Sequence, residues 1–177
     1  MRGWSFFYIT DKLYCLLMNN EPTTFIGIDP GLSGGIAILD TETNDVQLYD
    51  MPVLTDGKKR HIDIQAVLRI LRSVDNKSTF VGIENVNAMP GQGVTSMFTM
   101  GFGLGLLHAC VSSCNYPFTR VQPQTWKKDY SLLKKDKQAS IMKAKELFPE
   151  ADITLKRHDG RAEALLIADY TRRNMHC

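Results

Sequence analysis

The sequence predicts an α/β fold in which a five-stranded mixed sheet, three antiparallel strands plus two parallel ones, is flanked by helices. One observation is a short apolar stretch ending in a carboxylate that occurs twice, FIGID at residues 25–29 and FVGIE at residues 80–84. A second is that residues 24–50 read as three consecutive strands joined by tight turns. The third is a helical spacing of apolar residues between the two acidic strands, which allows a crossover connection and sets those strands parallel.

The chain has 177 residues and a formal net charge of +2, which suits one domain with a substantial core. We assign that domain to residues 21–177. Residues 1–20 are interpreted as an N-terminal extension, either disordered or the result of a misassigned start. They make a poor signal peptide, because Asp11 and Lys12 interrupt the apolar stretch. We expect a cytoplasmic location, in a bacterial or phage-infected cell, with organelle targeting by the extension as the alternative.

Cysteine usage and hydropathy further narrow the classes of protein that fit this sequence. The four cysteines form no CxxC pair and no His/Cys spacing that suits zinc, which favours a reducing compartment without a disulfide framework. We find no apolar run that approaches the roughly 20 residues needed to span a bilayer. The expectation is therefore a soluble protein.

The two acidic strands carry the first functional hypothesis. Gly27 and Gly82 occupy the same point in each strand, where a missing side chain lets another element pack closely. If the strands are parallel neighbours, Asp29 and Glu84 emerge at the same end of the sheet. Two adjacent carboxylates repel each other unless a proton or cation lies between them, and Mg²⁺ prefers such oxygen ligands. A metal site is therefore predicted; ordinary strand ends with solvated acids are the alternative.

The remaining elements follow in order along the chain. After the glycine-rich turn at residues 30–35 come the strands IAILD and VQLYD, and then residues 52–60 as a polar, basic loop. Residues 61–73 have the apolar spacing of an amphipathic helix that leads into the second acidic strand. A long helix is expected from Val94 to Cys114, where Gly101 and Gly105 lie one turn apart and indicate either a close intramolecular contact or a dimer seam.

The last third of the chain alternates a strand with helices. Residues 117–121 are predicted as a strand, a basic helical stretch begins at residues 123–126, and residues 135–148 form a helix stopped by Pro149. The final helix begins near Asp159. The predicted order is three antiparallel strands, a helix, a strand, a helix, a strand and further helices. This is the element order of a ribonuclease H-like fold.

The final helix supplies two more acids. Asp159 and Glu163 are four residues apart, which places them on one helix face. With Asp29 and Glu84 they make four carboxylates, enough to hold two Mg²⁺ ions about 4 Å apart for in-line hydrolysis of a phosphodiester. His158 is a possible ligand or proton shuttle, or else an exposed helix cap. For Asp159 the alternative is an N-cap.

Three sequence blocks together resemble the RuvC-like Holliday junction resolvases, especially their bacteriophage and chloroplast branch. They are IGIDPGLSGGIAIL, VGIENVNAMPGQGVTSMF and KRHDGRAEALLIA, and the resemblance covers residues 24–173. It implies a homodimer that binds four-way DNA junctions in recombination and repair and makes paired symmetric nicks, with two Mg²⁺ or Mn²⁺ ions per active site. The implied metal ligands and catalytic acids are Asp29, Glu84, Asp159 and Glu163. Bacterial RuvC proteins space the last two ligands by three residues and this chain by four, so His158 is kept as a substitute for Asp159.

The basic stretch from Arg120 to Lys145 contains eight basic residues and two acidic ones, an excess of six. The resemblance implies that Lys127 and Lys128 lie near the scissile phosphate, with Lys127 the better candidate for stabilising developing negative charge. Lys134, Lys135 and Lys137 are predicted to hold phosphates along the DNA arms. Solvated lysines on a helix face are the alternative for each.

The loop after Glu84 is predicted to meet the junction centre. Met89, Pro90 and Phe98 are candidates for an apolar wedge against unstacked bases, and Gln92 is a further DNA-binding candidate. Phe98 as a core residue of the first helical turn is the alternative.

Other functions stay open. An ATPase of the actin and Hsp70 type shares a strand-ending Asp followed by glycines, but it needs two such domains, and this chain is too short. A ribonuclease H-like nuclease that acts on other branched DNA or on RNA/DNA hybrids would use the same chemistry. A junction-binding protein without catalysis is disfavoured because all four acids are present.

Overall fold

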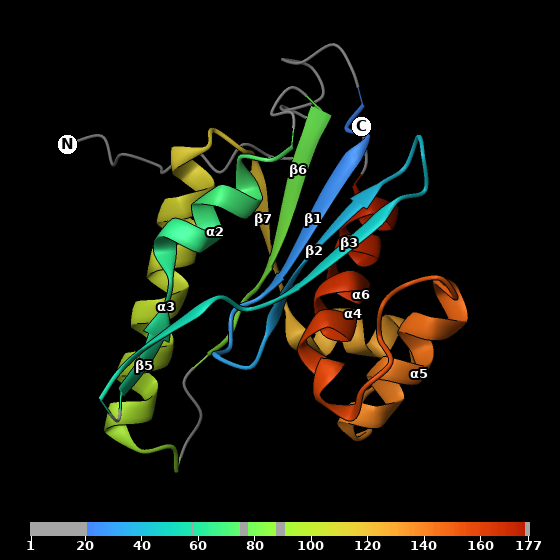
Figure 1. Ribbon diagram of the computed structural model, residues 1–177. Helices are drawn as coiled ribbons and strands as arrows, with labels where there is room; N and C mark the ends of the chain where they lie inside the picture. Colours follow the sequence, from blue (N-terminus) through green and yellow to red (C-terminus); the bar gives the residue numbers. More distant parts are fainter. Residues whose placement is uncertain (1–20, 58, 75–77, 88–90, 176–177) are drawn as a thin grey trace, which may run out of the picture.

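The structure is a computed structural model and describes residues 21–57, 59–74, 78–87 and 91–175. Its centre is a five-stranded sheet with the order β3-β2-β1-β6-β7 (Figure 1). The β1/β2 and β2/β3 pairs are antiparallel, and the β1/β6 and β6/β7 pairs are parallel, which confirms the predicted fold class. The strands of this sheet are β1 Thr24–Asp29, β2 Gly35–Asp40, β3 Val46–Asp50, β6 Thr79–Glu84 and β7 Phe118–Val121.

Helices cover both faces of the sheet. Figure 1 shows α2 and α3 on one side and α4, α5 and α6 on the other. The sheet therefore contributes to two apolar cores, one under α2 and α3 and one under α4 to α6. The helices are α2 Ile64–Leu71, α3 Val94–Ser113, α4 Pro123–Asp129, α5 Lys137–Leu147 and α6 Asp159–Asn174, with a 3₁₀ turn, Lys156–His158, directly before α6.

Glycines bring α6 against the sheet at backbone distance. A Cβ atom at Gly27 of β1 would collide with the carbonyl oxygen of Ala164, and one at Gly82 of β6 would collide with the hydroxyl of Thr171. At the start of α6, a Cβ at Gly160 would overlap the turn between β1 and β2. The close approach predicted from Gly27 and Gly82 is thus confirmed, and it fixes the height of α6 along β1.

Residues 52–60, predicted to be a loop, instead belong to a β-hairpin. Strands β4 (Val53–Asp56) and β5 (Lys59–Ile62) form a separate two-stranded antiparallel sheet. The turn contains Gly57 at φ +57°, a left-handed conformation that favours glycine. The prediction was wrong because each strand has only four residues and most of them are exposed, so no alternation of buried positions is visible in the sequence.

The hairpin also shortens the neighbouring helix. The predicted helix at residues 61–73 begins only at Ile64, because His61 and Ile62 belong to β5 and Asp63 caps α2 by accepting a hydrogen bond from the N–H of Ala66. In the same way, Asp136 caps α5, which starts at Lys137 and not at Lys135.

The long helix α3 is present as predicted, but its glycines do not face the sheet. No atom lies within 4 Å of a Cβ built at Gly101 or Gly105, so a close intramolecular contact at these two positions is wrong. Gly103 is the glycine that packs, against Ile62.

Helix α3 also corrects the hydropathy expectation. Over an 18-residue window its mean hydropathy is 1.5, and 17% of that window is buried. By length and composition alone it is long and apolar enough to cross a membrane, as no other helix in the described part of the chain is. The run was missed because Thr, Ser and Gly interrupt the strictly apolar residues without adding charge.

Candidate functional site

The two strand-ending acids lie at the same edge of the sheet. Strands β1 and β6 pair in parallel with Gly27 opposite Gly82 and Ile28 opposite Ile83. The next residue of each strand is the acid, so Asp29 and Glu84 emerge together, as predicted.

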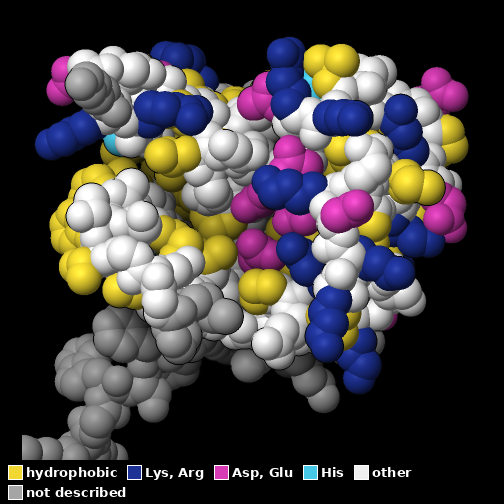
Figure 2. All heavy atoms as spheres, turned by 90° about the horizontal axis from the view of Figure 1, so that it is seen from below, with side chains coloured by type: hydrophobic (Ala, Val, Ile, Leu, Met, Phe, Trp, Pro, Cys, Tyr) yellow, Lys and Arg dark blue, Asp and Glu magenta, His cyan; other side chains and the backbone are white. Residues whose placement is uncertain are grey.

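The acids of α6 face this edge. Gly160 packs against the backbone of Ser33 and Gly34, in the turn that follows Asp29. Asp159 directly precedes Gly160 and Glu163 follows it by about one turn of helix, and both acids are half-buried. Figure 2, which views the molecule from below, shows acidic side chains gathered at the centre of this face.

The negative charges on Asp29, Glu84 and Glu163 repel one another. Burial raises the pKa of Asp29 to about 7, and the negative charges of Glu84 and Glu163 add to the effect. A hydrogen bond from the N–H of Gly31 at 3.3 Å and the positive charge of Lys127 act in the opposite direction. Near neutral pH, Asp29 is poised to hold a proton that a cation can replace.

Glu84 is held from α4. Its side chain is buried, with the residue 6% exposed, and its Oε1 accepts a hydrogen bond of 2.9 Å from the indole Nε1 of Trp126. Burial raises the pKa of Glu84, an effect that the hydrogen bond from Trp126 and the charge of Lys127 partly offset. The carboxylate is therefore fixed in place while remaining costly to ionise.

Glu163 has two partners from two helices. Lys127 Nζ of α4 lies 3.2 Å from Oε2, and Ser140 Oγ of α5 donates a 3.0 Å hydrogen bond to Oε1. The ammonium of Lys127 also lies 4.9 Å from the centroid of the Trp126 ring, within cation–π range. Lys127 thus reaches the acid cluster, and its predicted place beside a scissile phosphate stays a prediction.

Asp159 forms an ion pair with Lys137 of α5. The hydrogen bond to Asp159 raises the pKa of Lys137, and the charges of Asp159, Glu163 and Asp29 add to this effect. Lys137, assigned from the sequence to the DNA arms, is therefore paired with Asp159 and lies within the electrostatic influence of Glu163 and Asp29.

His158 is buried, at 4% exposure, so the expectation of an exposed helix cap is wrong in that respect. It is the N-cap of α6, and its Nδ1 accepts a 3.4 Å hydrogen bond from the N–H of Leu155. Asp159 is the first residue of the helix and not its cap. Both differences arise because the 3₁₀ turn runs straight into α6 and turns the imidazole inward.

The donor set suits a hard divalent cation. Four carboxylates and no sulfur come from the elements that meet at this edge of the sheet, and the pKa values of Asp29 and Glu84 are raised, first by burial and then by neighbouring carboxylates. Within the described residues, no three Asp, Glu, His or Cys side chains are grouped closely enough to hold an ion as they stand. The ammonium groups of Lys127 and Lys137 lie against Glu163 and Asp159 instead.

Most of the predicted DNA-binding residues are exposed, and their role stays a prediction. Gln92, Lys128, Lys134 and Lys135 are exposed. Phe98 is 74% exposed and stacks on Phe102 with ring centroids 6.3 Å apart, so its interpretation as a core residue is wrong. Met89 and Pro90 lie outside the described residues.

Sequence reasoning missed Trp126 and Ser140 as site residues. Trp126 is completely buried within a stretch read only for its charges, so a large aromatic residue beside two lysines was the available signal. Ser140 is 3% exposed, on the face of α5 that also buries Ile141 and Ala144. A polar residue on an apolar helix face was the signal in that case.

Comparison with known proteins finds similarity in the fold. No protein-family model and no curated protein matches the chain. The structure of Thermus thermophilus RuvC in complex with a Holliday junction substrate superposes with a TM-score of 0.60 at 15% identity, covering 86% of this chain and 97% of that one. A second Thermus thermophilus RuvC structure gives a TM-score of 0.51 at 16% identity, with the same coverage of 86% and 97%. The chain therefore has the ribonuclease H-like fold of RuvC, and at this identity the likeness concerns the fold.

Proposed function

We propose that this protein is a divalent-metal-dependent, structure-specific endodeoxyribonuclease that resolves four-way DNA junctions by paired symmetric nicks. The observation that carries the proposal is the meeting of Asp29, Glu84 and Glu163 from β1, β6 and α6, with the pKa of Asp29 raised to about 7. The shared fold supports it, since the superposed RuvC structure contains a Holliday junction substrate.

Asp29, Glu84, Asp159 and Glu163 are the proposed ligands for two Mg²⁺ or Mn²⁺ ions. When bound, the ions would activate a water molecule and stabilise the leaving oxygen of the phosphodiester. For Glu163 and Asp159 to serve as ligands, Lys127 and Lys137 must release them. Both lysines then become available to bind a phosphate. Breaking the two ion pairs therefore frees the carboxylates for the metal and the ammonium groups for DNA at the same time.

Within this proposal the residues around the acids have separate tasks. Lys127 stabilises negative charge on the phosphate, and the buried Trp126 and Ser140 keep Glu84 and Glu163 oriented. Exposed Lys128, Lys134 and Lys135 contact phosphates farther along the strand. Exposed Phe98 and Gln92 face the junction centre. His158, which accepts a backbone hydrogen bond, serves the start of α6 and not the metal.

A second copy of this chain is the proposed occupant of the exposed face of α3. Val94 and Phe102 on this face are 79% and 57% exposed, and Gly101 and Gly105 have open space beside them. An apolar surface of this kind marks an interface, and glycines one turn apart allow two helices to approach closely. Two symmetric nicks require two sites, which a homodimer supplies.

The dimer is tested by sedimentation of purified protein. Phe102→Asp should convert the dimer to a monomer and replace paired nicks with single ones. Met142→Asp, at a residue that is 66% exposed on α5, is the matched control and should leave the dimer intact. A wild-type monomer that still makes paired nicks would refute this part of the proposal.

The activity is tested with a panel of labelled four-way junctions, flaps, linear duplexes and RNA/DNA hybrids, each with and without Mg²⁺. We expect nicking of the four-way junction at symmetric positions, only with the metal present, and loss of nicking with retained binding for Asp29→Asn. Preferential cleavage of the RNA/DNA hybrid would assign the alternative nuclease. Junction binding without cleavage of any substrate would assign the non-catalytic alternative.

A further inference from the structure

We propose that the β4–β5 hairpin is a second DNA-contacting surface, which binds phosphates of a junction arm on the side of the acid cluster opposite to α5. The inference rests on the proposed function and extends it to a segment that the sequence presented only as a basic loop. The occupant is the phosphate backbone of duplex DNA, recognised by charge and not by base sequence.

The base of the hairpin is fixed to the core. Ile62 at the end of β5 is 4% exposed and packs against Gly103 of α3, while Met51, just before β4, is 5% exposed. The N–H of Asp63 donates a 2.9 Å hydrogen bond to the carbonyl oxygen of Pro52, which closes the two strands at their base. An element anchored in this way can hold its outer end at a defined place beside the molecule.

The outer part of the hairpin is exposed and carries cationic groups. Lys59, Arg60 and His61 follow one another in β5, and all three are exposed. In the described part of the chain, neither Lys59 nor Arg60 has a carboxylate within ion-pair distance. Asp56 lies opposite Lys59 in the ladder, but neither cation forms an ion pair there, so both remain available to a polyanion.

Arg60 ties the hairpin to the turn that follows β1. Its Nη2 donates a 3.3 Å hydrogen bond to the carbonyl oxygen of Leu32, in the turn that begins directly after Asp29. The bond satisfies one donor of the guanidinium and leaves its charge unneutralised. A DNA strand held by the hairpin would thus be held close to the turn that follows Asp29.

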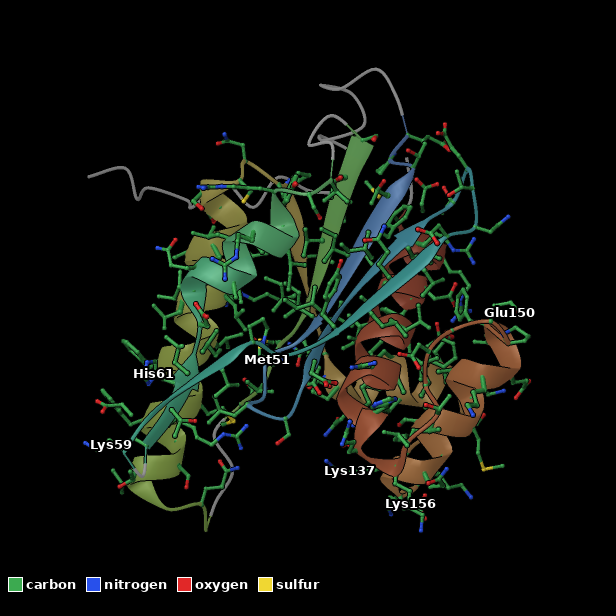
Figure 3. All side chains as sticks on the ribbon, in the orientation of Figure 1. Met51, Lys59, His61, Lys137, Glu150 and Lys156 are labelled. Atoms are coloured by element: carbon green, nitrogen blue, oxygen red, sulfur yellow. The ribbon has the colours of Figure 1, made fainter. Side chains whose placement is uncertain are left out.

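Basic groups consequently lie on two sides of the acidic centre. Figure 3 shows Lys59 and Lys137 on opposite sides of the lower end of the molecule, with Met51 between them. Figure 2 shows basic side chains both at its upper left and at its right, around the central acids. Because the acids themselves repel phosphates, a polyanion that crosses this face needs cations on both flanks, and duplex DNA fits that pattern.

The hairpin is tested by equilibrium binding of a labelled four-way junction, with Ca²⁺ in place of Mg²⁺, across a range of salt concentrations. Lys59→Glu should weaken binding by roughly 10-fold and reduce the slope of log K against log salt by about 1, since each phosphate contact contributes about 0.9. Asp56→Asn, which removes a negative charge directly opposite Lys59 in the ladder, should strengthen binding. The matched control is Arg69→Glu, an exposed arginine in the last turn of α2, and it should leave both quantities unchanged.

The outcomes separate this inference from the proposed function. If Lys59→Glu binds like Arg69→Glu while the wild type still nicks junctions, the hairpin inference is overturned and the nuclease proposal stands. If the salt slope depends on Lys59 but no branched DNA is nicked in Mg²⁺, the hairpin inference stands and the nuclease proposal fails. A wild-type protein that binds neither junction nor duplex overturns both.

Discussion

The indole N–H of Trp126 donates a 2.9 Å hydrogen bond to the buried carboxylate of Glu84. The residue that follows Trp126 forms the ion pair with Glu163. Two consecutive residues of the short helix α4 therefore reach two acids that come from different elements, β6 and α6.

Trp126→Phe should weaken the site without removing any acid. The ring still fills most of the buried volume, but the buried Glu84 loses its donor, which costs about 1–3 kcal/mol for a group left unsatisfied. We expect lower stability in urea unfolding and a higher Mg²⁺ concentration for half-maximal nicking. In a double-mutant cycle with Glu84→Met, which removes the acceptor, the effects of the two substitutions on stability should couple strongly. Simple additivity would show that the hydrogen bond contributes nothing.

Asp29→Asn should stabilise the metal-free protein at high pH. The pKa of Asp29 is raised from 3.8 to about 7 in the folded state, so the folded protein binds the extra proton. Its contribution is fully present below about pH 4 and is lost as the pH rises through about 7. In EDTA at pH 8 we expect the amide to gain about 1–3 kcal/mol, because one pKa unit corresponds to about 1.4 kcal/mol.

The same variant should lose its response to metal. Adding Mg²⁺ to the wild type at pH 8 should raise the midpoint of thermal unfolding, since a ligand at 100 times its Kd stabilises by about 2.7 kcal/mol. Asp29→Asn should show a much smaller rise. Equal shifts for both proteins would remove Asp29 from the proposed ligands.

Lys127→Met should abolish most of the nicking while junction binding is retained. Loss of a group that stabilises transition-state charge costs about 10²–10³ in rate. Lys127 also lowers the pKa of both Asp29 and Glu84, so its removal should make these acids harder to ionise. Lys128→Met, at the exposed neighbour, should weaken binding and leave the rate at saturating protein unchanged. Similar rates for both variants under single-turnover conditions would count against the assignment.

Gly27→Ala should displace α6 and disable the site from a distance. The added Cβ meets the backbone of Ala164, which cannot move aside as a flexible side chain can. We expect a loss of about 1–3 kcal/mol or more in urea unfolding, together with loss of nicking. Gly31→Ala is the control, because its Cβ would lie 3.6 Å from the nearest atom, an ordinary contact. Unchanged stability in both variants would contradict the close packing of α6 on β1.

The sequence was sufficient for the sheet and for the meeting of Asp29 with Glu84. Both strands are apolar runs that end in an acid, and the helix between them allows a crossover to a parallel neighbour, so the shared edge of the two acids was predictable from the pattern. The positions of Gly27 and Gly82 likewise indicated where another element would pack closely against the sheet. These features depend on the local pattern of apolar residues and on the limited set of backbone conformations that each residue can adopt.

Other features depend on distant partners and were not predictable. The hydrogen bond from Trp126 to Glu84 joins residues 42 positions apart and depends on how α4 turns against β6. The hairpin is fixed by Ile62 packing on α3, and not by its own polar strands. His158 is buried because the 3₁₀ turn continues into α6 without a break. In each case the tertiary contact, and not the local sequence, selects the conformation.

Helix α6 follows every strand of the sheet in the chain, and it carries Asp159 and Glu163. A translation or proteolysis product that stops before residue 159 would therefore hold two of the four acids and lack the helix that brings in the rest. For the proposed nuclease, this order means that the metal site can be completed only after the last helix of the sheet's cover has been made.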